Sequence, residues 1–403
     1  MRTYSCLCGN TLFFDNSSCL TCGREVGFCP ACRLITALVP NEQGGFNCGH
    51  ADCGAALLKC ENYLEHDVCN RCVRAEAAAE QPLCDCCHFN DLIPDLTVKG
   101  NLLKWYRLEA AKRRLFYDLG ELGLPYGTEE DGIEPPLSFD FKADVIPKKN
   151  YWRGGGADTE RVYTGHANGK ITINIREACD VEREKLRVDL GEAHRTLIGH
   201  FRHEIGHYYW DMLIKGRRED EFIAVFGDHN NPTYAEALER HYEQGPPAEW
   251  QQSYVSAYAT MHPWEDFAES WALYLDMTSS LDTAAWQGFG GTTDAVHKDV
   301  EPMMKRYQQL GVALNEINRS MGLLDLVPEV IVPPVVEKLR YTHNLVRAGH
   351  EENGALKTAD EQLPAIATVQ PPAIEAEVAP FADTPPPQVA TPAKQPPAPV
   401  LSQ

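Results

Sequence analysis

Apolar residues recur with a helical period at several places in the middle of the chain. Between residues 196 and 213 they are three or four positions apart, at Leu197, Phe201, Ile205, Tyr208 and Met212. This spacing predicts a helix with one apolar face. Residues 101–123 show a similar pattern and predict a second, longer helix. A third helix is expected from His262-Pro263 to Met277, because proline is favoured at the first helical position.

Other parts of the chain lack this period. Lys170–Ile175 alternates polar and β-branched residues, which predicts a half-buried strand. Residues 1–98 hold most of the cysteine, and residues 351–403 are rich in proline and alanine. The latter segment has too few large apolar residues to offset the entropy of ordering it. We therefore expect an α+β protein with a cysteine-rich region over 1–98, an α-rich globular domain over 99–350 and a disordered tail over 351–403.

The charge of the chain restricts its partners. The 403 residues carry a formal net charge of −21. Such a chain is repelled by phosphate backbones and anionic lipids, so neither nucleic acid nor a membrane is expected as a partner. No run of about 18 apolar residues is present that could form a membrane-spanning helix. The first residues also lack the apolar core of an export signal, so we expect a cytoplasmic location.

Cysteine is concentrated at the N-terminal end, where 14 of the 15 residues lie before position 88. In a reducing compartment, cysteines at short spacings are more often metal ligands than disulfide partners. We expect two to three structural zinc ions, each held by a set of four cysteines. The third set is drawn from the six cysteines that lie outside the first two sets. The sets are Cys6, Cys8, Cys19 and Cys22; Cys29, Cys32, Cys48 and Cys53, with His50 as a spare ligand; and Cys60, Cys69, Cys84 and Cys87.

These cysteine sites are expected to stabilise the fold, because a zinc ion with four thiolate ligands has no open coordination position. Residues 1–98 contain six Lys/Arg and twelve Asp/Glu, and each four-thiolate site adds further negative charge. This balance disfavours nucleic-acid binding, a common role of zinc ribbons. A structural role and the docking of a protein partner are the two roles that we expect for this region.

The predicted helix 196–213 contains the pattern His-Glu-x-x-His. His203 and His207 are four positions apart, so both imidazoles project from one helix face and can bind one catalytic zinc ion. Glu204 can then act as general base toward a zinc-activated water. For the nearby His194 and His200 we expect ordinary packing or surface roles.

A catalytic zinc ion usually has a third protein ligand. No third histidine follows at the spacing seen in some zinc peptidases, because Trp210 and Ile214 occupy that part of the chain. Glu265 and Glu269, four positions apart in the predicted helix that begins at Pro263, are the alternatives. The simpler interpretation is a solvated acidic face, but the aromatic residues around them indicate burial, and a buried carboxylate needs a partner.

The chain resembles a known group of enzymes at these motifs. The pattern His-Glu-x-x-His followed by Glu265-Asp266-Phe267-Ala268-Glu269 is similar to that of gluzincin metallopeptidases of the lethal-factor type. Nearly the whole chain before the tail resembles a bacterial family that combines a zinc ribbon with a zinc-binding metallopeptidase domain. The stretches that carry this resemblance are 12–15 (LFFD), 93–96 (IPDL), 165–169 (GHANG), 199–211 (GHFRHEIGHYYWD) and 262–269 (HPWEDFAE).

The resemblance implies a zincin-like domain in which His203, His207 and Glu265 bind zinc, Glu204 is the base and Glu269 supports a ligand histidine. It also implies that a tyrosine seven residues before the ligand glutamate, here Tyr258, stabilises the oxyanion. Packing against neighbouring aromatic residues is an equal alternative for that tyrosine, and His262 is a second candidate donor.

Two smaller expectations concern residues outside these motifs. In this kind of fold the strand before the zinc-binding helix lies at the sheet edge, which implies that Lys170–Ile175 is the edge strand and can pair with a substrate. Core packing is the alternative explanation of its isoleucines. Cys179 is expected to be a buried free thiol.

We therefore predict a zinc metallopeptidase that hydrolyses peptide bonds in a peptide or protein substrate. The alternative is a catalytically silent protein in which the zinc-ribbon region binds a partner and the zincin site has no turnover.

Overall fold

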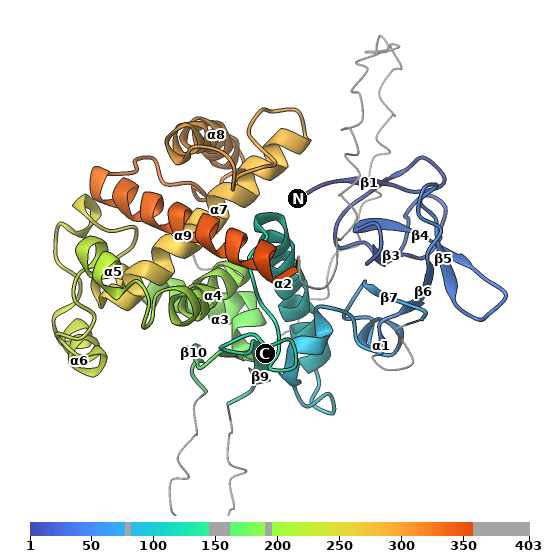
Figure 1. The fold of residues 1–403 in the computed structure, drawn as a ribbon, viewed down its shortest axis with the longest axis horizontal. Helices are drawn as coiled ribbons and strands as arrows, with labels where there is room; N and C mark the ends of the chain where they lie inside the picture. Colours follow the sequence, from blue (N-terminus) through green and yellow to red (C-terminus); the bar gives the residue numbers. More distant parts are fainter. Residues whose placement is uncertain (77–81, 145–161, 190–195, 358–403) are drawn as a thin grey trace, which may run out of the picture. The chain divides into compact units, whose positions relative to one another are not determined.

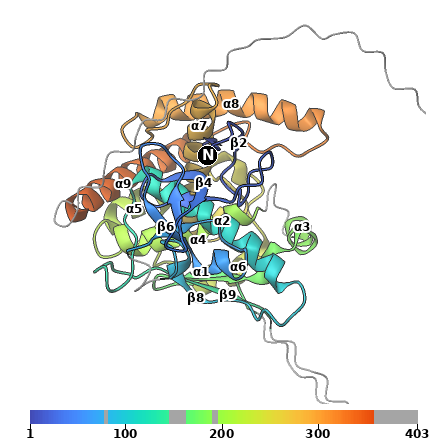
Figure 2. The same cartoon turned by 90° about the vertical axis from the view of Figure 1, so that its right-hand side faces the viewer.

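Short antiparallel strands build the N-terminal region in the computed structural model, which describes residues 1–76, 82–144, 162–189 and 196–357 (Figure 1). β1 and β2 form a two-stranded sheet, and the remaining strands form an antiparallel sheet of order β3-β4-β5-β6-β7. Figure 2 brings β4 and β6 to the front. The elements are β1 (Tyr4–Ser5), β2 (Thr11–Leu12), β3 (Val26–Cys29), β4 (Leu34–Pro40), β5 (Phe46–Cys48), β6 (Ala56–Lys59), α1 (Glu61–Leu64) and β7 (Cys72–Arg74).

Two cysteine turns in this region depend on glycine. Gly9 and Gly23 have left-handed backbone conformations, with φ values of 84° and 71°. Each donates its N–H to the carbonyl of the first cysteine of its turn, Cys6 at 2.9 Å and Cys19 at 2.8 Å. A side chain would strain this conformation, which explains why glycine closes both turns.

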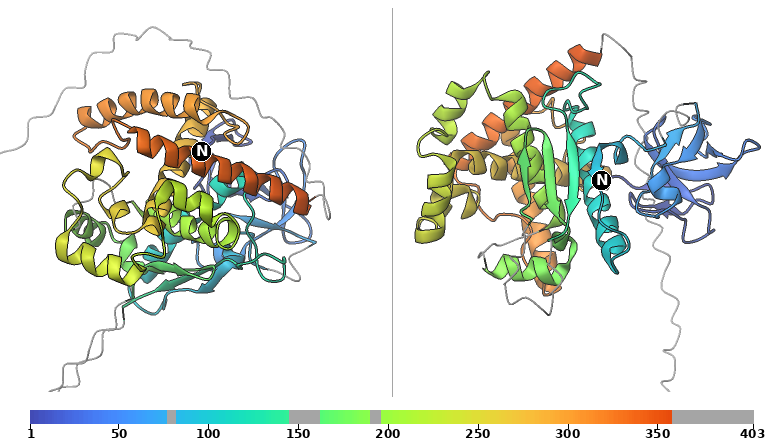
Figure 3. Two further views of the ribbon diagram at one scale, coloured as in Figure 1. Left: turned by 60° about the vertical axis from the view of Figure 1, so that its left-hand side comes forward. Right: turned by 90° about the horizontal axis from the view of Figure 1, so that it is seen from below.

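A second, mixed sheet lies in the following region and has the order β10-β11-β9-β8. β9 is parallel to both of its neighbours, and β10 is antiparallel to β11. Phe139 and Phe141 of β9 and Ile171 and Ile173 of β11 are fully buried. Figure 3 shows these strands from below, beside helix α2. The elements are η1 (Cys87–Phe89), β8 (Asn90–Leu92), α2 (Asn101–Leu122), β9 (Ser138–Lys142), β10 (Gly165–Ala167) and β11 (Lys170–Asn174).

The predicted strand at 170–175 is confirmed as β11, but the prediction that it is the edge strand is wrong. β11 pairs with β10 on one side and with β9 on the other, so β10 is the edge strand on that side of the sheet. The reason is a tight hairpin: Ala167 pairs with Lys170, and Asn168 and Gly169 form the turn at φ values of 49° and 82°. Asn-Gly is the preferred dipeptide for such a turn.

Helices make up most of the remaining chain. α2, α4 and α7 confirm the three predicted helices, and α7 extends beyond the expected end at Met277. α8 and α9 pack against α7 (Figure 3). The elements are η2 (Ile175–Ala178), α3 (Asp180–Asp189), α4 (Leu197–Leu213), α5 (Glu219–Phe226), α6 (Tyr234–Gln244), η3 (Trp250–Gln252), η4 (Tyr258–Thr260), α7 (Pro263–Trp286), α8 (Val300–Ser320) and α9 (Pro333–Lys357).

The end of α9 bears on the predicted domain boundary. The helix continues to Lys357, past residue 350, where the globular domain was expected to end. The predicted tail beyond Lys357 lies outside the described residues. Among the described residues, no helix combines the length and apolar composition that crossing a membrane requires.

Helices α4 and α7 approach each other closely at Gly206. A Cβ atom at this position would lie 3.0 Å from Cα of Ala268 and 3.2 Å from Cβ of Trp271. The pair is reinforced by Arg202 of α4, which forms ion pairs with Asp118 of α2 and Asp276 of α7. A small residue at 206 is therefore required where these two helices cross.

We predict that Gly206→Ala lowers the free energy of unfolding by about 1–3 kcal/mol, the usual cost of overpacking a core. The measurement is urea unfolding followed by circular dichroism. The matched control is Gly354→Ala in α9, where an added Cβ meets nothing within 4 Å. That variant should be neutral or more stable by up to about 1 kcal/mol, since alanine is the better helix former. Equal behaviour of the two variants would contradict the packing argument.

Candidate metal centres

His203 and His207 face the same point from one side of α4. The N-cap residue Thr196 accepts a hydrogen bond from the Gly199 N–H, and the helix then runs without a break through both histidines. Their Nε2 atoms lie 3.2 Å apart. His207 is 3% exposed, so the pair lies at the margin of the core rather than on an open helix face.

Glu265 of α7 meets the two histidines. Its Oε2 atom lies 3.0 Å from Nε2 of His203 and 3.3 Å from Nε2 of His207. A tetrahedral ion bound at about 2.0–2.1 Å holds its ligand atoms about 3.3 Å apart. The three observed distances, 3.0, 3.2 and 3.3 Å, fit this requirement. The donor set of two imidazoles and one carboxylate is also one that zinc prefers.

The electrostatics of the three side chains favour a cation between them. Burial lowers the pKa of His203, but its hydrogen bonds to Glu265 and Glu269 outweigh this and hold the pKa well above its usual value. Burial raises the pKa of Glu265, but the two histidines keep it well below the usual value. Positive charge is therefore strongly stabilised where the three side chains converge, and a divalent cation would satisfy this preference.

Glu269, one turn after Glu265, lies behind His203. Its Oε1 atom is 2.6 Å from Nδ1 of His203, the nitrogen that faces away from Glu265. Burial raises the pKa of Glu269, and this hydrogen bond lowers it below its usual value. An ionised carboxylate here can fix the orientation and tautomer of the imidazole, as in many metal sites.

Glu204 of α4 is also buried, with 7% exposure. Its carboxyl interacts electrostatically with His203 and His207. Among the described residues, none forms a hydrogen bond with its Oε2 atom. Burial raises the pKa of this carboxyl above its usual value. A buried carboxylate with an uncommitted oxygen and a raised pKa is a stronger proton acceptor than an exposed one.

Aromatic rings surround the histidines. The ring centres of Trp264 and His207 lie 3.8 Å apart, and those of Tyr258 in η4 and His203 lie 6.1 Å apart. Tyr258, the tyrosine that the resemblance implies, thus lies near His203, and its role stays a prediction. His166 of the edge strand β10 stacks on His207 at 6.4 Å.

Two residues at the site were missed from the sequence. His166 lies in the stretch 165–169, for which we expected no particular role, and the Asn-Gly turn signal could have located its hairpin. Tyr234, the first residue of α6, donates its hydroxyl to Oε1 of Glu265 at 2.8 Å. The capping sequence Thr233-x-x-Glu236 indicates where α6 begins, but no local signal indicates this contact.

Other candidate histidines have different contacts. Nδ1 of His262 accepts from the Trp264 N–H, which caps α7, and Nε2 lies 3.1 Å from the His229 carbonyl. Both nitrogens are thus engaged, which argues against His262 as an oxyanion donor. His200 lies 3.3 Å from Glu177 and outside the metal-ligand group. His194 lies outside the described residues.

The cysteines expected as ligands also converge. The four sulfur atoms of each expected set lie within 4.8 Å of one another. The S–S distances are 3.7 and 3.6 Å in the first set, 3.8 and 3.7 Å in the second, and 3.8 Å for Cys69–Cys84 in the third. Four thiolates bound to zinc at about 2.3 Å lie about 3.8 Å apart. These distances fit tetrahedral zinc and are far longer than a disulfide bond of about 2.0 Å.

The remaining cysteines and His50 do not belong to these groups. Cys72 and Cys86 are buried, and the expected spare ligand His50 lies outside the second group. Cys179 follows η2 and is half-buried rather than buried as expected.

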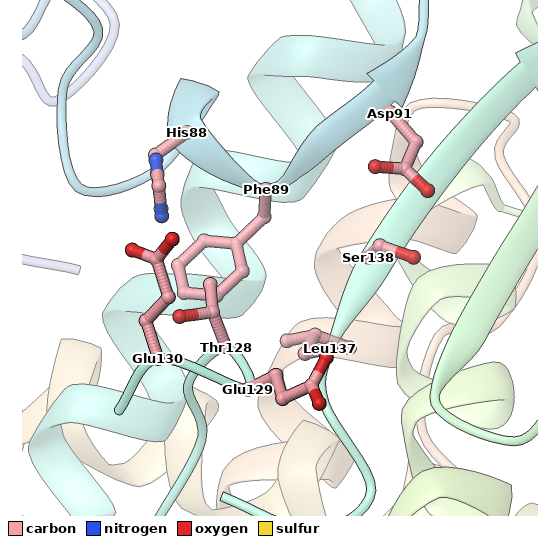
Figure 4. Close-up of a pocket in the computed structure, with 8 residues that line it drawn as sticks. All are labelled: His88, Phe89, Asp91, Thr128, Glu129, Glu130, Leu137 and Ser138. Atoms are coloured by element: carbon pink, nitrogen blue, oxygen red, sulfur yellow. The ribbon is translucent and has the colours of Figure 1, made fainter. Parts of the chain in front are cut away.

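A pocket of about 310 Å³ is lined by residues of η1, β8, β9 and the segment before β9 (Figure 4). Carboxylates of Asp91, Glu129 and Glu130 line it together with His88. The lining includes none of the residues of the four candidate metal groups. Acidic side chains alone do not identify a ligand, so this pocket adds nothing to the functional assignment.

Comparisons with known proteins agree with this geometry. The family described as "Putative zinc-binding metallo-peptidase" matches residues 101–345, and a zinc-ribbon domain family matches residues 3–98. The chain belongs to this zinc-binding metallopeptidase family. The resemblance drawn from the motifs is confirmed, as is the α+β fold with a cysteine-rich N-terminal region. The gluzincin type stays a prediction.

Similar proteins are found in mycobacteria. Uncharacterized proteins of Mycobacterium bovis and of two strains of Mycobacterium tuberculosis are each 37% identical to the chain over 355 residues, covering 86% of this chain and 95% of theirs. No solved structure matches the chain. Both regions of the chain thus belong to known families. The roles of individual residues are inferred from the positions of their side chains.

We predict that Cys87→Ala reduces the zinc content of the purified protein by about one ion, whereas Cys86→Ala leaves it unchanged. The two cysteines are adjacent and both are 0% exposed, so the loss of side-chain volume is matched. Only Cys87 belongs to the third four-cysteine group. Elemental analysis by mass spectrometry measures the difference, and an equal zinc content in both variants would contradict the assignment of this site.

Proposed function

We propose that this protein is a zinc-dependent metallopeptidase of the gluzincin type, with His203, His207 and Glu265 as ligands of one catalytic zinc ion. One observation carries the proposal: Nε2 of His203, Nε2 of His207 and Oε2 of Glu265 lie 3.0–3.3 Å from one another. The helices that supply them, α4 and α7, are far apart in the sequence. We assign Glu204 as the general base and Glu269, whose Oε1 atom lies 2.6 Å from Nδ1 of His203, as the partner of that ligand. The cysteine groups hold two to three further structural ions.

A zinc ion held by His203, His207 and Glu265 would lower the pKa of a bound water molecule and would polarise the scissile carbonyl. Glu204 would accept the proton of the water that attacks the peptide carbonyl, and would then transfer this proton to the leaving amine. Its buried position and raised pKa support both steps. Glu269 keeps His203 in the ligating orientation.

Tyr258 is our proposed oxyanion donor. Burial raises the pKa of its hydroxyl, and the neighbouring Glu265 and Tyr234 raise it further, so the phenol keeps its proton. A neutral phenol can donate to the negative oxygen that develops during attack on the carbonyl. The centre of its ring lies 6.1 Å from that of the His203 ring, which supports a position close to the reacting atoms.

The edge strand β10 supports a binding mode for the substrate. Among the described residues β10 pairs only with β11, so its other edge has backbone groups free to pair with an extended peptide. Its middle residue, His166, stacks on His207. A peptide added to this edge would therefore pass the proposed zinc ligands. The zinc-ribbon region remains a candidate docking site for a protein partner.

We predict that Glu204→Gln keeps the full zinc content but lowers peptidase activity at least about 100-fold, since general-base catalysis contributes about 10²–10⁴-fold. The substitution keeps the size of the side chain and removes only its ability to accept a proton. The assay is incubation of each protein with a complex mixture of synthetic peptides, followed by mass spectrometry of the products.

The same assay separates the two candidate functions. His203→Ala should lose about one zinc ion, and retention of that ion would refute the proposed ligand set. A wild-type protein that holds this zinc but generates no products beyond those of Glu204→Gln would favour the catalytically silent protein-binding alternative.

We further predict that Tyr258→Phe lowers kcat about 10²–10³-fold with unchanged zinc content, the usual effect of losing one oxyanion donor. Tyr242→Phe is the control, because Tyr242 is 73% exposed on nearby α6. If Tyr258 serves only to pack against its neighbours, Tyr258→Phe will retain the wild-type kcat.

A further inference from the structure

The two oxygens of Glu265 have different surroundings. Oε2 faces the imidazole nitrogens of His203 and His207, at 3.0 and 3.3 Å. Oε1 accepts a hydrogen bond from the Tyr234 hydroxyl at 2.8 Å. The residue is 2% exposed, so water has little access to the carboxylate. One oxygen is thus directed to the metal position, and the other is held by a phenol.

Tyr234 reaches Glu265 from a separate part of the fold. It precedes Glu265 by 31 positions and is the first residue of α6, not part of the crossing pair α4 and α7. The start of α6 is well defined, because Thr233 and Glu236 form a reciprocal capping box. The tyrosine ring also contacts His262 at 5.4 Å and Trp264 at 5.8 Å, on either side of Pro263. These contacts direct the hydroxyl toward Glu265.

We propose that Tyr234 is a positioning residue for the zinc ligand Glu265, a role that rests on the zinc site proposed above. Its hydrogen bond occupies Oε1 and fixes the carboxylate plane, which leaves Oε2 as the single oxygen presented to the metal. A carboxylate that binds through one oxygen leaves more of the coordination sphere for water and substrate. Partners of this kind typically contribute 10- to 100-fold to metal affinity.

This role differs from that proposed for Tyr258. Tyr258 stands over His203 and is proposed to donate to the reacting oxygen. Tyr234 donates to a ligand of the metal, and its hydroxyl also interacts with that of Tyr258. Loss of the Tyr234 hydroxyl should therefore weaken the binding of zinc itself, whereas loss of the Tyr258 hydroxyl should act mainly on turnover.

The test is competition for zinc between the full-length protein and a soluble chelator, followed on the ion that His203→Ala lacks. Tyr234→Phe removes the hydroxyl and keeps the ring contacts with His262 and Trp264. It should release this zinc at about 10- to 100-fold lower chelator concentration than the wild type. Tyr242→Phe, the same substitution on the same helix at an exposed position, should behave as the wild type.

A double-mutant cycle with Glu265→Ala shows whether Tyr234 acts through the carboxylate. Tyr234→Phe should have no further effect on zinc affinity once Glu265 is removed, because the interaction energy then disappears. Wild-type zinc affinity in Tyr234→Phe, or an undiminished effect in the Glu265→Ala background, would overturn the inference. If His203→Ala itself lost no zinc, the proposed zinc site would fail before Tyr234 is tested.

Discussion

The close crossing of α4 and α7 is the constraint on which the candidate site depends. Gly206 lies against Ala268 where the helices cross. His203 and His207 stand three positions before and one position after Gly206, and Glu265 and Glu269 stand at the same offsets from Ala268. The two pairs are thereby placed opposite each other. Because metal-ligand distances tolerate only about ±0.2 Å, a small increase in the distance between the helices would separate the ligands.

Buried ion pairs hold these helices against their neighbours. Arg202 joins α4 to Asp118 of α2, and Lys338 of α9 lies 2.7 Å from Asp266, the residue after Glu265. Lys338 also donates a hydrogen bond to the Ser253 carbonyl, which links α9 to the segment that precedes Tyr258. Removing one partner of such a pair leaves an uncompensated buried charge, which is strongly destabilising. These pairs therefore specify the arrangement of helices around the site.

The zinc-ribbon region shares its core with the metallopeptidase region through α2. Arg113 of α2 donates to the Val68 carbonyl at 2.6 Å, and Cys87 lies 3.9 Å from Glu109. Lys112 forms a fully buried ion pair with Glu109 at 3.1 Å and places positive charge near the third cysteine group. A four-thiolate zinc site carries net negative charge, so these cations suit their position. The third cysteine group is thus part of the structure that supports α2, against which α4 packs.

The sequence by itself determined helices α2, α4 and α7, strand β11 and the chemistry of the residues they carry. The helical period around His203 and His207, the proline that begins α7, and the spacing of Glu265 and Glu269 are local patterns, and local patterns report helix faces reliably. The cysteine groups converge as their short spacings suggested. Only the tertiary structure decided which strand forms the sheet edge, that His262 is a helix cap, and that Tyr234 reaches Glu265. The pairing of β11 with β9 and the contact of Tyr234 with Glu265 join residues distant in the chain, and such contacts leave no periodic signal in a single sequence. The cap at His262 is local, but the contact of its other nitrogen with the His229 carbonyl spans 33 positions.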